Sequence, residues 1–152
     1  MTDVPAGPEP VDGADYADRW LRAAAELENL RKRFAVQLAR EQAVERARVA
    51  ATWLPVVDNL ELALAHAPAA GDALSAGVRE VRDQAVRVLD ALGYRRHDET
   101  GVPYDPARHE AVSVQAGTDA DPGTVVAIVR PGYGDGDAQL RPASVVVAGG
   151  PE

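Results

Sequence analysis

The chain has 152 residues, no cysteine, only 5% aromatic residues and a net charge of −8. This length excludes two large domains, and the lack of cysteine excludes disulfides, thiolate metal sites and cysteine nucleophiles. Residues 97–152 hold nine Asp and Glu against three Arg, which disfavours a nucleic-acid surface in that part.

Residues 1–14 are expected to form a disordered tail. They contain three prolines and two glycines among few bulky apolar side chains, so burial cannot offset their ordering entropy. They lack the basic and apolar regions of a secretory signal, which makes cytoplasmic residence the expectation. No apolar stretch approaches the ~20 residues of a membrane-spanning helix, so no membrane partner is expected.

A long helix is predicted over residues 15–54, where neither Gly nor Pro occurs. From Asp18 to Thr52 it would be roughly 50 Å long, too long for a domain of this size to cover. Heptad spacing indicates a seam, formed by Trp20, Ala23, Leu27, Leu30 and Phe34. Beyond the seam the spacing changes to about 3.6–3.7, which predicts looser pairing. A paired stalk is favoured over an amphipathic helix lying on its own core, because little other apolar mass exists to cover the seam.

A helical hairpin is predicted over residues 55–93. Pro55 permits a bend or a first-turn position, and the apolar residues after it form a short helix ending near Ala67-Pro68. Asp72 can cap a second helix through about Leu92, with Gly93 as its C-terminal stop. Two helices cannot enclose a core alone, so two copies of the hairpin are expected to form a four-helix bundle.

The seam and the hairpin together predict a homodimer. Its expected contact residues are the apolar side chains on these two surfaces, namely Trp20, Leu27, Leu30, Phe34, Leu60, Leu64, Val81 and Val88.

A small antiparallel β-domain is predicted over residues 94–148, followed by a short tail at 149–152. The apolar period changes to two, and the candidate strands are 94–97, 111–114, 125–129 and 144–147. Gly, Pro and Asp clusters separate these strands. The fold class is therefore α+β.

No motif for catalysis or direct nucleotide binding is found. The glycines form no phosphate-cradling loop, and the three histidines lie far apart without a hydrolytic signature. The run GYGDGD at 132–137 reads as a strand connection rather than a Ca²⁺ loop, because it lacks the Glu spacing of an EF-hand. The basic run 31–33 reads as a solvated helix face rather than a nucleic-acid site. No cofactor, metal or enzymatic activity is expected.

Four blocks together resemble the GrpE family. The first two are AELENLRKRF at 25–34 and WLPVVDNLELAL at 53–64, and the third joins Gly77-Val78 to Leu89–Gly93. The fourth begins with Asp105-Pro106-x-x-His109-Glu110 and continues through Gly132-Tyr133 to the run LRPAxVxV at 140–147. The resemblance covers roughly residues 16–148.

The resemblance implies a parallel homodimer that binds the nucleotide-binding domain of a DnaK-type heat-shock chaperone. It implies nucleotide exchange, with faster ADP release, in support of protein folding and of the response to heat and hyperosmotic stress. The chaperone-binding residues implied are Tyr104, Pro106, Val129, Arg141 and Val147 in the β-domain, Gly77 in the hairpin, and Glu28, Asn29 and Arg31 on the stalk. Within the chain, Arg141 could instead pair with Asp137, Val129 and Val147 could belong to the β-domain core, and Gly77 could allow close helix approach.

Three residues depart from the family pattern: Tyr104, Leu62 and Ala138, the last standing where an Arg commonly occurs. The alternative functions are a coiled-coil dimeric adaptor and a diverged paralogue without exchange activity. The adaptor alternative explains the stalk but leaves the 43-residue pattern from Asp105 to Val147 unexplained.

Overall fold

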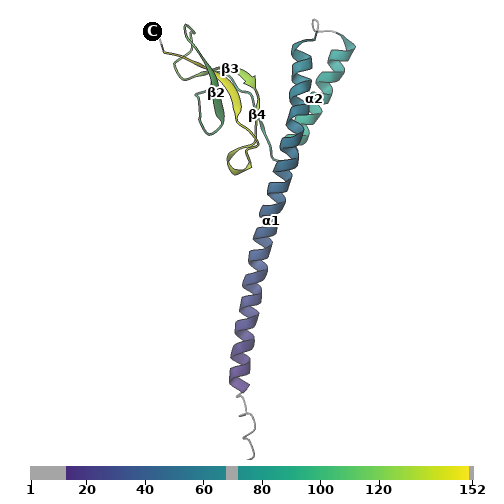
Figure 1. Cartoon of the computed structure of the whole chain (residues 1–152), viewed down its shortest axis with the longest axis vertical. Helices are drawn as coiled ribbons and strands as arrows, with labels where there is room; N and C mark the ends of the chain where they lie inside the picture. The colour runs from purple at the N-terminus through teal and green to yellow at the C-terminus, as the bar shows by residue number, and fades with distance from the viewer. Residues whose placement is uncertain (1–12, 68–71, 151–152) are drawn as a thin grey trace, which may run out of the picture. The chain divides into compact units, whose positions relative to one another are not determined.

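The computed structural model describes residues 13–67 and 72–150, with two helices, α1 (Gly13–Ala65) and α2 (Ala73–Ala91) (Figure 1). The chain divides into two compact units, with the boundary between Val44 and Glu45. The predicted tail at residues 1–12 lies outside the described residues. Gly13 and Ala14, which were expected in that tail, belong to α1.

Helix α1 continues through Pro55, so the prediction of a separate helix beginning there is wrong. Proline lacks an N–H and costs about 3 kcal/mol inside a helix. The opposing effect is burial, because Leu54 and Val57 on either side of it are only 4% and 3% exposed. Burying two such side chains contributes about 1.5–3 kcal/mol each, and both reach the core only while the helical phase is kept.

Helix α2 begins and ends as its sequence predicts. The Asp72 carboxylate accepts hydrogen bonds from the backbone N–H groups of Leu74 at 2.5 Å and Ser75 at 3.2 Å. Gly93 has a φ of +91°, a value that favours glycine. Its N–H bonds to the Asp90 carbonyl, and the Tyr94 N–H bonds to the Leu89 carbonyl, which is the Schellman pattern.

The β-domain contains two small sheets. Strands β1 (Arg96–His97) and β4 (Gly132–Tyr133) pair antiparallel. In the other sheet the order is β2-β5-β3, with β2 (His109–Gln115) parallel to β5 (Ala143–Ala148) and β3 (Val125–Arg130) antiparallel to it. The expectation of an antiparallel sheet is therefore correct for β3 and wrong for β2, because β5 inserts between two strands that are consecutive in sequence.

The two cores of residues 45–150 have no residue in common. The helical core consists of Ala50, Leu54, Val57, Leu89, Tyr94 and Tyr133. The sheet core consists of Val125, Ala143, Val145 and Val147, with Val102, Tyr104 and Ile128 packed against it. Tyr133 on β4 is the β-domain residue that is fully buried among the helices.

The run GYGDGD forms strand β4 and a 3₁₀ turn at Gly136–Ala138. Gly132 of this run lies where β4 passes close to the first residue of β5, and a Cβ on Gly132 would be 2.6 Å from the Ala143 nitrogen. Gly77 on α2 differs, because a Cβ there would meet no atom within 4 Å. The expectation that Gly77 allows close helix approach is therefore wrong within one copy of the chain.

We predict opposite effects for alanine at these two glycines. Gly132→Ala forces the backbone at Ala143 to move and should lower the free energy of unfolding by about 1–3 kcal/mol. Gly77→Ala fills open space on a helix and should raise it by about 0.5–1 kcal/mol. Urea unfolding followed by circular dichroism measures both values, and a neutral Gly132→Ala would contradict the close approach.

We also predict that the Asp72 cap makes stability depend on pH. The hydrogen bonds from Ser75 and Leu74 lower the pKa of the Asp72 carboxyl. A lowered pKa means that the cap stabilises the fold above the ordinary pKa and loses this effect as pH falls through the folded value. Asp72→Asn keeps an acceptor that does not titrate. The melting temperature of the unsubstituted protein should therefore fall relative to that of Asp72→Asn between roughly pH 5 and pH 2, and a constant difference would contradict this role.

Candidate protein-binding surfaces

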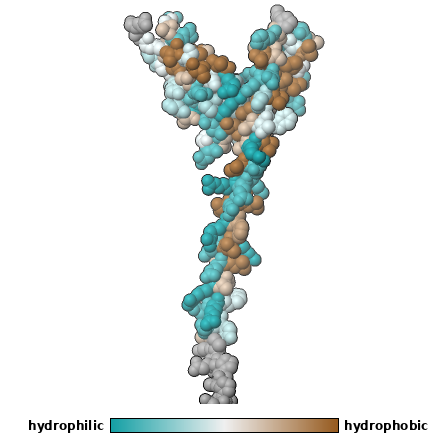
Figure 2. Space-filling model, in the orientation of Figure 1, coloured by the Kyte–Doolittle hydropathy of each residue, from teal (hydrophilic) through white to brown (hydrophobic). Residues whose placement is uncertain are grey.

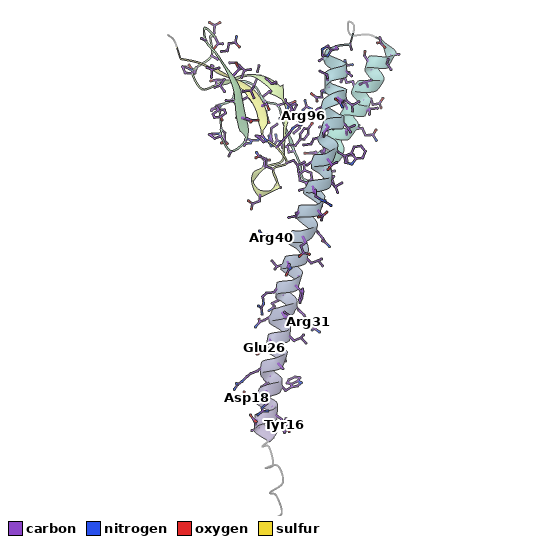
Figure 3. All side chains as sticks on the ribbon, in the orientation of Figure 1. Tyr16, Asp18, Glu26, Arg31, Arg40 and Arg96 are labelled. Atoms are coloured by element: carbon purple, nitrogen blue, oxygen red, sulfur yellow. The ribbon has the colours of Figure 1, made fainter. Side chains whose placement is uncertain are left out.

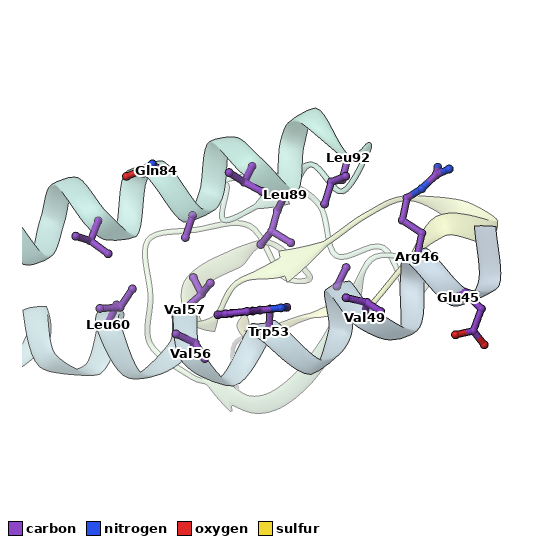
Figure 4. A pocket seen from close by; sticks show the side chains of 14 residues that line it. Glu45, Arg46, Val49, Trp53, Val56, Val57, Leu60, Gln84, Leu89 and Leu92 are labelled. Carbon is purple, nitrogen blue, oxygen red and sulfur yellow. The ribbon is translucent and has the colours of Figure 1, made fainter. Parts of the chain in front are cut away.

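An apolar groove lies between α1 and α2, and we call it the hairpin groove (Figure 4). It encloses about 730 Å³. Its apolar lining residues are Val49, Ala50, Trp53, Val56, Val57, Leu60, Val81, Ala85, Val88, Leu89 and Leu92. Trp53 remains 60% exposed and Val88 54% exposed, so the chain leaves large apolar side chains of this groove uncovered. An apolar surface of this kind indicates a protein contact.

Figure 2 shows apolar residues gathered on the hairpin helices. The predicted contact residues Leu60, Val81 and Val88 line the hairpin groove. Leu64 is half-buried and does not line it. The fold thus brings three of the four predicted hairpin residues to one surface.

The predicted seam is exposed along α1. Trp20, Leu27, Leu30 and Phe34 are between 45% and 70% exposed. Along the same helix, side chains such as Asp18, Glu26 and Arg31 project outward (Figure 3). Within its own compact unit, the heptad stripe between residues 13 and 44 is therefore left exposed.

The remaining stalk residues and Gly77 are also exposed. Glu28, Asn29 and Arg31 lie on the surface of α1, where Glu28 forms an ion pair with Lys32 at 3.8 Å. Gly77 lies on the surface of α2. Side chains or backbone at these positions are accessible to a partner.

The predicted β-domain residues differ in accessibility. Pro106 and Val129 are exposed, and Val129 is 63% exposed, so its possible place in the core is wrong. Val147 is 8% exposed and belongs to the sheet core. Tyr104 is half-buried against that core, with its ring 6.0 Å from the His109 ring. Only Pro106 and Val129 are thus fully available for contact.

His109 is held in its neutral form. Burial, and then the Arg108 charge, lower the pKa of the His109 imidazole. Its Nδ1 accepts a hydrogen bond from the Asp105 N–H at 3.0 Å, which requires that nitrogen to be unprotonated. The residue therefore fastens the 105–109 turn that carries Pro106.

Asp135 in the GYGDGD run is engaged with two side chains of the same domain. Its Oδ1 lies 3.0 Å from His97 Nε2 and 3.4 Å from Arg108 Nε. Across the described residues, no group of three or more His, Asp or Glu side chains is arranged to hold a metal ion. The same ranges contain no helix with the length and apolar character needed to cross a membrane.

Two ion pairs join α1 to the β-domain, and we call them the charged joint. Arg141 donates from Nη1 and Nη2 to the two oxygens of Asp58, each at 2.5 Å. Arg96 bonds to Glu61, which also accepts from Arg82 at 3.2 Å. The alternative that Arg141 pairs with Asp137 is therefore wrong.

The joint is charged and shielded. Burial opposes the charge of Arg96, but the hydrogen bonds to Glu61 and Asp98 outweigh it and raise the pKa of the guanidinium. Burial raises the pKa of the Tyr133 hydroxyl, against the effect of Arg96, which donates to it at 3.3 Å. Both groups therefore keep their ordinary charge states at neutral pH.

Sequence reasoning gave no role to the other three residues of the charged joint, namely Asp58, Glu61 and Arg96. A signal was present, because Asp58 and Glu61 continue the stripe of Ala50, Leu54 and Val57 at helical spacing. Carboxylates that continue a buried stripe indicate buried cationic partners. The identity of those partners, 35 and 83 positions further along, could not be read from spacing.

Comparison with known proteins gives a consistent result. The family model described as GrpE matches residues 11–149. The chain belongs to the GrpE family. Among its GrpE relatives, Protein GrpE 2 of Streptomyces avermitilis is 60% identical over 148 residues, covering 93% of this chain and 73% of that protein. Protein GrpE of Thioalkalivibrio sulfidiphilus is 38% identical, covering 91% and 75%, and that of Thermus thermophilus is 35% identical, covering 86% and 72%.

Proposed function

We propose that this GrpE-family protein is a homodimeric nucleotide exchange factor for a DnaK-type heat-shock chaperone. The family match over residues 11–149 is the observation that carries the proposal. The protein acts in the cytoplasm, where it supports protein folding and the response to heat and hyperosmotic stress. It has no catalytic role of its own and does not bind the nucleotide directly.

The homodimer is supported by the two uncovered apolar surfaces. The hairpin groove exposes Trp53 and Val88, and the seam exposes Trp20 and Phe34. A second copy of α1 and α2 would complete a four-helix bundle over the groove, and a second α1 would cover the seam. One partner with this same sequence accounts for both surfaces.

The β-domain is the proposed main contact with the chaperone. Pro106 on its fastened turn and Val129 on β3 are exposed, rigidly placed and apolar. Tyr104 and Val147 act by supporting these elements from the sheet core. Gly77, Glu28, Asn29 and Arg31 supply the further contacts along the helices.

Exchange requires only differential binding. A protein that binds the open nucleotide cleft better than the closed cleft shifts the chaperone toward the open state, from which ADP leaves faster. By linkage, bound nucleotide must weaken the binding of this protein by the same factor, so ATP rebinding releases it. No step in this cycle needs a residue of this chain to touch the nucleotide.

A second candidate is a diverged paralogue with altered or lost exchange activity. Ala138 favours it, because a methyl group cannot make the polar contact that an Arg at this position could make. The adaptor function is the third candidate, and it predicts partner binding without faster ADP release.

We predict that the hairpin groove drives dimerisation. Val88→Glu would bury an unpaired carboxylate in each copy and should raise the dimer dissociation constant by at least about a hundredfold. Val114→Glu is the matched control, because Val114 is 67% exposed on β2 and does not line the hairpin groove. Sedimentation velocity at micromolar concentration measures both, and an equal effect of the two variants would place the dimer contact elsewhere.

We predict that the protein accelerates ADP release from the chaperone in a saturable manner, through a contact that includes the surface of α2 at Gly77. Stopped-flow release of a fluorescent ADP analogue from a DnaK-type chaperone should become faster with the unsubstituted protein. Gly77→Asp should abolish the acceleration, since its side chain projects into space that the chain itself leaves open. Ala76→Asp adds the same charge about 100° around the helix and should retain most of it.

Two results would contradict this proposal. No acceleration by the folded dimer would favour the adaptor or the inactive paralogue. Equal loss in both α2 variants would mean that an added charge on α2, rather than the Gly77 surface, is responsible.

A further inference from the structure

The charged joint lies between two cores that do not merge. The helical core and the sheet core have no residue in common, and Tyr133 is the fully buried side chain that the β-domain contributes to the helices. Beside the joint, α1 and the three-stranded sheet border a groove of about 560 Å³, lined by Leu62 and Ala65 on one side and Val112 and Val129 on the other. Because a groove rather than close packing separates them, apolar contacts alone leave the angle of the sheet to α1 free to change.

The Arg141–Asp58 pair has the geometry to fix that angle. The guanidinium is bidentate to the carboxylate, and its Nε donates to the Pro131 carbonyl at 3.0 Å. It also lies over the Tyr133 ring, 5.5 Å from the centroid. A planar guanidinium that is hydrogen-bonded to Asp58 and to the Pro131 carbonyl restricts the rotation of the β-domain about α1, whereas a contact through a single charged atom would not.

The second pair adds a separate attachment one turn further along α1. Glu61 accepts from Arg96 on β1 and from Arg82 on α2, so it connects three elements. Arg96 in turn donates to the Tyr133 hydroxyl. Ion pairs at two different points on α1 fix the orientation of the β-domain, whereas a single ion pair would let the β-domain rotate about it.

Shielding separates these pairs from the other ion pairs of α1. The side chains of Arg141 and Asp58 are 14% and 28% exposed, and those of Arg96 and Glu61 are 18% and 23% exposed. In the Asp18–Arg22 pair they are 55% and 75% exposed. Solvent and salt strongly weaken exposed ion pairs. The two pairs of the charged joint are therefore better suited than the exposed pairs of α1 to hold the β-domain in a fixed orientation.

We propose that Asp58 and Arg141, with Glu61 and Arg96, are positioning residues that hold the β-domain at the angle required for docking on the chaperone. The inference rests on the proposed exchange function. Arg141 acts through Asp58 rather than by touching the chaperone, since all three of its guanidinium nitrogens have partners within the chain.

This positioning role predicts that breaking the charged joint lowers the affinity for the chaperone without changing the maximal rate of ADP release. When the joint is broken, the β-domain spends only a fraction of its time at the docking angle, and the apparent dissociation constant rises by the inverse of that fraction. Once docked, the protein makes the same contacts as before. A residue that touches the chaperone in the open state would change both quantities.

The first test is a titration of ADP release with the full chain and a DnaK-type chaperone. Asp58→Asn should raise the half-saturating concentration about tenfold and leave the maximal rate unchanged. Asp18→Asn makes the same chemical change in an exposed pair of the same helix and should alter neither value. Arg141→Gln should match Asp58→Asn, and the double variant should cost no more than either single variant, because both changes remove one interaction.

The second test measures the angle without any chaperone. The chain has no cysteine, so Ala63→Cys on α1 and Ser113→Cys on β2 give two specific, exposed positions for spin labels. Dilution with unlabelled protein suppresses distances between copies. The label distance should have a narrow distribution in the unsubstituted joint and with Asp18→Asn, and a broad one with Asp58→Asn.

Additive losses in the double variant would overturn the proposal and make Arg141 a direct contact. An unchanged label distance in Asp58→Asn, or an unchanged half-saturating concentration, would overturn it as well. If the unsubstituted protein fails to accelerate ADP release, the proposed function is wrong, and the label distance still decides whether the joint sets the angle.

Discussion

The unbroken helical phase of α1 through Pro55 is the constraint on which the rest of residues 45–150 depends. It places Ala50, Leu54 and Val57 in one stripe that forms the helical core with α2, and it extends that stripe to Asp58 and Glu61. A break at the proline would rotate the carboxylates away from Arg141 and Arg96. The cost of a proline inside the helix is therefore offset by apolar burial on one side and by shielded ion pairs on the other.

The same stretch of helix has two apolar faces with different roles. Ala50, Leu54 and Val57 are buried with Leu89 and Tyr133 within the chain, whereas Trp53 and Val56, which line the hairpin groove, stay exposed. A monomer with a small core and large exposed apolar surfaces is poorly stabilised by itself. The proposed homodimer would supply the missing burial, so that folding, assembly and function depend on the same residues.

The β-domain is organised around its last strand. β5 is buried along most of its length because β2 and β3 flank it, and Gly132 allows β4 to approach the start of β5 closely. Tyr133 then reaches the helical core while Arg141 reaches Asp58. The connection between the helices and the β-domain thus combines the buried Tyr133 ring, with Leu140 packed against the same core, and a set of shielded charges that fix the orientation.

The sequence by itself determined the α+β class, the Asp72 and Gly93 ends of α2, most strand positions and the apolar surfaces, because caps, glycines and apolar periods act over a few neighbouring residues. Sequence patterns gave the wrong prediction for Pro55 and for the direction of β2. They also did not show that Val129 is exposed or that Arg141 pairs with Asp58. Those features were decided only by the tertiary structure. Core burial overrides a local helix breaker, and a last strand can insert between two earlier ones. Ion pairs such as Asp58–Arg141 join residues 83 positions apart that no local pattern relates.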